Sequence, residues 1–132
     1  KHSCRVLFVL QKRSGMKVNI LGTEYTVEEH KISEDEIMKK RQLAGYHSEE
    51  SHKIVYADMS ETDYIDLESD AERDTYRKQT IRHEIVHAFL SESGLSASSS
   101  EIDAWAKNEE MVDWMAIQLP KIIEACKTVG AL

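Results

Sequence analysis

The segment "TIRHEIVHAFL", residues 80–90, holds the side chains of this chain that are best suited to chemistry. His83 and His87 are four positions apart, and Glu84 follows the first histidine. On an α-helix, residues at that spacing share a face with Cβ atoms about 5–6 Å apart, so two imidazoles can bind one metal ion. Zinc held by neutral imidazoles lowers the pKa of a coordinated water to about 7, and an adjacent carboxylate can take that water's proton. The pattern predicts one Zn2+ per chain, bound by His83 and His87, with Glu84 as general base.

A rival interpretation makes these histidines surface residues of a charged helix in a metal-free interaction protein, because short H-E-x-x-H patterns also arise by chance. The neighbouring residues argue against it. Ile81, Ile85 and Val86 flank the histidines, and residues 88–90 are apolar as well. Polar side chains on a buried face need partners, and a metal ion would supply one.

A long helix is predicted to carry this motif. Ser69 and Glu72 form a capping box, and no proline or glycine follows until Gly94, which predicts a helix over residues 70–92. The serine-rich segment 93–100 is typical of a linker. A second helix, capped by Ser100 and Asp103, is expected over residues 101–119, and Pro120 should kink or end it.

The first half of the chain predicts a small sheet with one helix. Residues 17–21 and 24–27 favour a hairpin with Gly22 and Thr23 in the turn. A helix is expected from about Glu34 to Ala44, with Ser33 as its cap and Gly45 at its stop. The run "KIVYA", residues 53–57, predicts a further strand.

Composition narrows the class of protein. A chain of 132 residues is long enough for one domain, and a net charge of -7 argues against direct binding of nucleic acid. The longest apolar run near the N-terminus is too short for a signal peptide or a membrane span. Cys4 and Cys126 form no metal or disulfide pattern, which favours a reducing, cytoplasmic setting. We interpret residues 1–15 as an N-terminal extension or a cloning remnant, and we expect a monomer.

The motif and the order of the segments around it resemble a known group of enzymes. "HEIVH" followed by a linker and a helix with "NEEMVDWMA" is similar to zincin metallopeptidases. With "NILGTEYTV" and "KIVYA" placed before it, the chain most resembles, over most of residues 16–123, the small ImmA/IrrE-like metallopeptidases of phages, prophages and other mobile elements. This resemblance implies that Glu109 is the third zinc ligand and that Asp113 orients a ligand histidine. Glu110 is the alternative third ligand, because it is adjacent.

The resemblance also implies a fold and an activity. The fold would be α+β: one minimal zincin-like domain over residues 16–132, with a small, mostly antiparallel sheet packed on the motif helix and on the helix that carries the third ligand. The activity would be that of a zinc metalloendopeptidase that cleaves an intracellular protein, with a repressor-type regulator as one candidate substrate. The strand "KIVYA" would lie at the sheet edge and pair with an extended peptide. The alternative is a zinc-binding regulatory protein of a mobile element that cleaves nothing.

Other residues could contribute to such a site, but each also has an ordinary explanation. His47 and His52 could donate to an oxyanion or act as a fourth ligand, and they could equally be solvated turn histidines. Tyr56 could contact the oxyanion or the substrate, although an apolar-flanked tyrosine is more often a core residue. Trp105 and Trp114 are predicted to pack in the core as part of an apolar band on the last helix.

Overall fold

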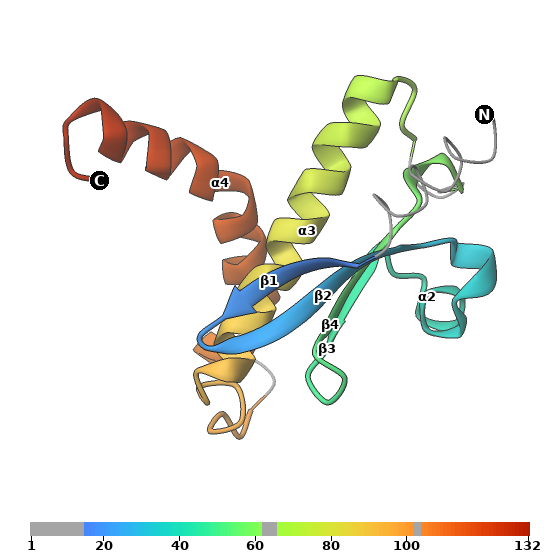
Figure 1. Cartoon of the computed structure of the whole chain (residues 1–132), viewed down its shortest axis with the longest axis horizontal. Helices are drawn as coiled ribbons and strands as arrows, with labels where there is room; N and C mark the ends of the chain where they lie inside the picture. Colours follow the sequence, from blue (N-terminus) through green and yellow to red (C-terminus); the bar gives the residue numbers. More distant parts are fainter. Residues whose placement is uncertain (1–14, 62–65, 102–103) are drawn as a thin grey trace.

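The computed structural model describes residues 15–61, 66–101 and 104–132, so the proposed N-terminal extension lies almost entirely outside the described residues. The protein is α+β, with three helices and a four-stranded sheet in the described part (Figure 1). The strands are β1 Met16–Ile20, β2 Thr23–His30, β3 Gly45–Ser48 and β4 Lys53–Ala57. The helices are α2 Glu36–Arg41, α3 Asp70–Glu92 and α4 Glu109–Thr128, and short 3-10 turns lie at Ile32–Glu34, Met59–Glu61 and Trp105–Lys107.

The sheet has the strand order β1-β2-β4-β3. The outer pairs are antiparallel, whereas β2 and β4 are parallel, so the sheet is mixed. The prediction that "KIVYA" is an edge strand was wrong, because β3 pairs with β4 and itself forms the edge. The strand β3 was not predicted, since its four residues "GYHS" have no apolar alternation and resemble a turn.

The predicted hairpin is present, with its turn one residue earlier than expected. Leu21 and Gly22 occupy the two turn positions, both with positive φ, at 51° and 92°. That conformation matches the twist of the two strands, and glycine adopts it at no steric cost. The side chain of Asn19 accepts a hydrogen bond from the Gly22 N–H at 2.8 Å and closes the turn.

The helix α2 is shorter than predicted at both ends. Its N-cap is Asp35 rather than Ser33, because the Asp35 carboxylate accepts from the N–H groups of Ile37 and Met38, both at 3.0 Å. The helix ends at Arg41, its C-cap Gln42 adopts the left-handed conformation, and the predicted stop residue Gly45 instead begins β3.

The long helix α3 spans residues 70–92 and begins at the Ser69 cap, as the sequence predicts. It lies along one face of the sheet (Figure 1). Tyr25, Ile54 and Tyr56 of the sheet are buried with Ala88 of α3 between the two layers. On the opposite face, Met38 of α2 packs on the sheet.

The helix α4 begins at Glu109, later than predicted, because residues 105–107 form a 3-10 turn and Asn108 caps the helix by accepting from the Met111 N–H at 2.8 Å. Asp103, which was predicted to cap the helix together with Ser100, lies outside the described residues. Val112 and Ala116 are fully buried on α4, and Val112 packs on Val86 of α3. The second half of α4 turns away from α3 (Figure 1).

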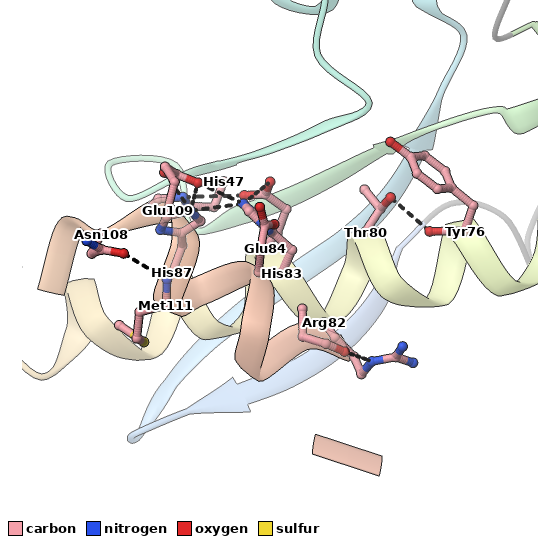
Figure 2. Close-up of polar contacts among 12 residues, drawn as sticks. His47, Tyr76, Thr80, Arg82, His83, Glu84, His87, Asn108, Glu109 and Met111 are labelled. Atoms are coloured by element: carbon pink, nitrogen blue, oxygen red, sulfur yellow. Dashed lines mark hydrogen bonds and ion pairs between the residues drawn. The ribbon is translucent and has the colours of Figure 1, made fainter. Parts of the chain in front are cut away.

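Pro120 does not end α4, which continues to Thr128. A proline lacks the N–H that would bond to the carbonyl four residues earlier, here that of Ala116. The Nε of Arg82, on α3, donates to this carbonyl at 2.6 Å (Figure 2). The arginine therefore occupies the place of the missing helical hydrogen bond and ties α4 to α3 beside His83.

The two tryptophans contradict the prediction of core packing. Trp105 is 61% exposed and Trp114 is 57% exposed, whereas Met111 and Met115 are the members of the apolar band that pack on the core. Val112 and Ala116 are four positions apart and form the buried face of α4, whereas Trp114 lies midway between them in the sequence and therefore points away from that face. In the described part of the chain, no helix combines the length and apolarity needed to cross a membrane.

Candidate metal centre

Two histidines of α3 and one carboxylate of α4 converge on one point (Figure 2). The Nε2 atoms of His83 and His87 are 3.1 Å apart. The Oε2 of Glu109 lies 3.2 Å from the Nε2 of His83 and 3.3 Å from the Nε2 of His87. The structure thus brings together three atoms able to hold a metal ion, from helices that the linker separates in the sequence.

The spacing of these donors fits a tetrahedral ion. Zinc binds imidazole nitrogen and carboxylate oxygen at about 2.0–2.2 Å, which places two ligand atoms of a tetrahedron about 3.3 Å apart. The three separations among His83 Nε2, His87 Nε2 and Glu109 Oε2 lie within a few tenths of an ångström of that value. Three protein donors leave a fourth position for water or substrate, which is the pattern of catalytic sites rather than of closed structural ones.

Asp113 fixes the tautomer of His83. Its Oδ1 lies 2.7 Å from the Nδ1 of His83, and a carboxylate accepts, so Nδ1 carries the hydrogen. The Nε2 lone pair then points toward Glu109 and His87. Asp113 lies one turn after Glu109 on α4, so both carboxylates face α3.

Glu109, and not Glu110, is the carboxylate in the cluster. Glu110 instead lines a surface groove with the two tryptophans. The sequence left this choice open because the two glutamates are adjacent and lie on neighbouring faces of the helix.

The environment of His87 favours its neutral form. Burial lowers the pKa of His87, and the nearby His83 and His47 lower it further, against the opposing effect of Glu109 and Glu84. A neutral imidazole is the form that binds metal.

Glu84 is buried at 6% exposure and lines a cavity of about 290 Å³ beside the cluster. Its Oε1 lies 3.9 Å from the Nε2 of His83. Residues of α3 and α4, the start of β3 and the loop before it complete the wall of this cavity, namely Leu43, Ala44, Gly45, Tyr76, Gln79, Thr80, His83, Glu109 and Asp113. A carboxylate able to act as a base and the donors His83 and Glu109 therefore face the same cavity.

Gly45 allows β3 to lie this close to Glu84. A Cβ at position 45 would be 2.7 Å from the Cγ2 of Thr80 and 3.0 Å from the carbonyl oxygen of Val55. Both distances are shorter than van der Waals contact allows. The absence of a side chain at Gly45 thus brings the edge strand against the motif helix.

His47, two residues along β3, points to the same side as Gly45. Its Nε2 lies 3.1 Å from the Oγ of Ser91, its Nδ1 lies 3.6 Å from the Oε2 of Glu84, and its ring stacks on His87 with centroids 5.4 Å apart. The structure therefore places His47 beside the cluster formed by His83, His87 and Glu109. The sequence did not indicate a role for Ser91, the hydrogen-bond partner of His47, because nothing in the pattern distinguishes it from other serines in helices.

The structure does not bring His52 or Tyr56 to the cluster. His52 lies in an exposed turn at positive φ, with its ring 5.3 Å from that of Tyr25. Tyr56 is 3% exposed in the core, with the Arg77 guanidinium 5.9 Å from its ring centroid. Neither residue lines the cavity beside Glu84.

Comparisons with known proteins provide no further assignment. No protein-family model matches the chain, no curated protein matches its sequence and no solved structure matches its fold.

Proposed function

We propose that this protein is a zinc-dependent metallopeptidase of the zincin kind, acting in the cytoplasm on a peptide bond of another protein. The observation that carries the proposal is the convergence of His83, His87 and Glu109 at tetrahedral spacing, with the carboxylate of Glu84 buried beside them. A metal site used only for folding would need no base at that position and would use a fourth protein ligand.

Glu84 and Asp113 would have separate roles in peptide-bond hydrolysis. A bound zinc ion would supply a Lewis acid that polarises the carbonyl and acidifies water. Glu84 would take a proton from the attacking water as its oxygen bonds to the peptide carbon, and would deliver that proton to the amine when the C–N bond breaks. Asp113 would hold His83 in the tautomer whose Nε2 can donate a lone pair.

The resemblance to ImmA/IrrE-like metallopeptidases suggests a narrow substrate range, with a repressor-type regulator as a candidate. The test is therefore a survey of new protein N-termini by mass spectrometry, in lysate of the source cells incubated with zinc-loaded protein. Wild type should create N-termini that Glu84→Gln does not create. Zinc-loaded, folded wild type that produces the same N-termini as Glu84→Gln would refute peptidase activity and leave a zinc-binding protein.

A further inference from the structure

Both tryptophans of the chain line one groove on the surface, outside the cluster of His83, His87 and Glu109. The groove has a volume of about 470 Å³ and is lined by Trp105, Asn108, Glu110, Met111 and Trp114. Most of each indole is exposed, and among the described residues neither ring stacks on another aromatic side chain. Large exposed aromatic groups gathered at one place are typical of binding surfaces.

The charge in this groove points to the chemistry of its ligand. Glu110 is the one charged residue in its lining. Within residues 15–61, 66–101 and 104–132, the Glu110 carboxylate has no ion pair and accepts no hydrogen bond. The chain as a whole carries a net charge of -7, so the surrounding field also attracts cations.

We propose that this groove binds an arginine side chain of a partner protein. A guanidinium stacks on indole faces, pairs with a carboxylate through two parallel hydrogen bonds, and has an apolar stem that can lie along Met111. A lysine ammonium offers neither the planar stack nor the paired bonds. A purely apolar side chain would leave Glu110 without a partner.

The position of the groove connects it to the proposed activity. Glu109 belongs to the cluster with His83 and His87, whereas Glu110, the next residue, belongs to the groove. Both sites therefore share the first turn of α4. If the partner is the substrate, which rests on the proposed function, an arginine near the cleaved bond would determine which proteins are cut. The groove itself needs neither zinc nor catalysis to bind.

The fluorescence of the chain offers a selective test, because its only two tryptophans are in the groove. The experiment titrates acetyl-Gly-Arg-Gly-amide into Glu84→Gln protein and records tryptophan emission. The matched probe acetyl-Gly-citrulline-Gly-amide has nearly the same shape and no charge. We expect saturable binding of the arginine peptide that is about five- to tenfold tighter than binding of the citrulline peptide.

Two charge-matched variants locate the effect. Glu110→Gln should abolish the preference for arginine, whereas Glu124→Gln, which removes the same charge from an exposed position near the end of α4, should preserve it. His83→Ala should also preserve the preference for arginine, which shows that the groove binds independently of the cluster of His83, His87 and Glu109. Equal binding of both peptides, the absence of saturable binding, or an arginine preference that survives Glu110→Gln would each overturn the proposal, whatever the outcome of the peptidase test.

Discussion

The hydrogen bond from Arg82 to the Ala116 carbonyl predicts a specific dependence on Pro120. Replacing Arg82 with methionine keeps the apolar stem and removes the donor, so the carbonyl loses its partner at 2.6 Å. An unpaired carbonyl of this kind costs about 1–3 kcal/mol. In a Pro120→Ala background, the alanine N–H can bond to the Ala116 carbonyl in the ordinary helical way. There Arg82→Met should therefore cost about 1 kcal/mol less than in the wild-type background.

Urea denaturation of the metal-free protein measures this coupling, because chelation removes any contribution from ion binding to stability. The cycle needs wild type, both single variants and the double variant, all with the same slope against urea. If Arg82→Met costs the same free energy of unfolding in both backgrounds, Arg82 does not replace the hydrogen bond that Pro120 lacks.

Three further predictions concern the site and its support. Asp113→Ala should weaken zinc binding about 10- to 100-fold in a chelator competition, because His83 loses the carboxylate that fixes its tautomer; unchanged affinity would contradict that role. Gly45→Ala should destabilise the fold by about 1–3 kcal/mol, with partial recovery when Thr80→Ser removes the clashing methyl group; an equal loss in both backgrounds would disprove the steric explanation. Asp35→Ala should cost about 2–4 kcal/mol through the lost cap and buried hydrogen bonds, and Asp35→Asn less.

Asp35 also predicts a pH dependence. Burial alone would raise its pKa, but hydrogen bonds from His30, from the Met38 N–H and from Tyr46 outweigh burial and lower the pKa of Asp35 below 3.8. A carboxyl whose pKa is lower in the folded state contributes stability above its unfolded pKa, and loses it as pH falls through the folded value. The thermal unfolding temperature of wild type should therefore fall more steeply below pH 3.8 than that of Asp35→Asn. Parallel plots of unfolding temperature against pH for the two proteins would contradict this assignment.

The sequence predicted the features that depend on local patterns. The capping box at Ser69 and the absence of helix breakers were enough to predict the full length of α3, and the spacing of His83 and His87 was enough to place both on one face. The start of α4 could not be predicted, since Ser100, Asp103 and Asn108 all have side chains that can cap a helix. The choice between Glu109 and Glu110 also depended on the packing of α4 on α3, because adjacent helical residues point to neighbouring faces.

Features that depend on contacts between distant segments were not visible in the sequence. The strand β3 is held in place by pairing with β4 and by the close approach of Gly45 to Thr80, neither of which leaves a local pattern. Pro120 was expected to kink or end the helix, because a hydrogen bond from Arg82 on another helix cannot be inferred from residues near the proline.

Metal content tests the central claim most directly. The zinc content of protein purified without added zinc would be measured by mass spectrometry. Four proteins would be compared: wild type, His87→Ala, Glu109→Ala and Glu110→Ala. The geometry of the cluster predicts one zinc ion per chain in wild type and in Glu110→Ala, and its loss in the other two variants. Folded wild type that binds no zinc even when it is supplied, or a zinc ion that depends on Glu110 rather than Glu109, would contradict the proposed site.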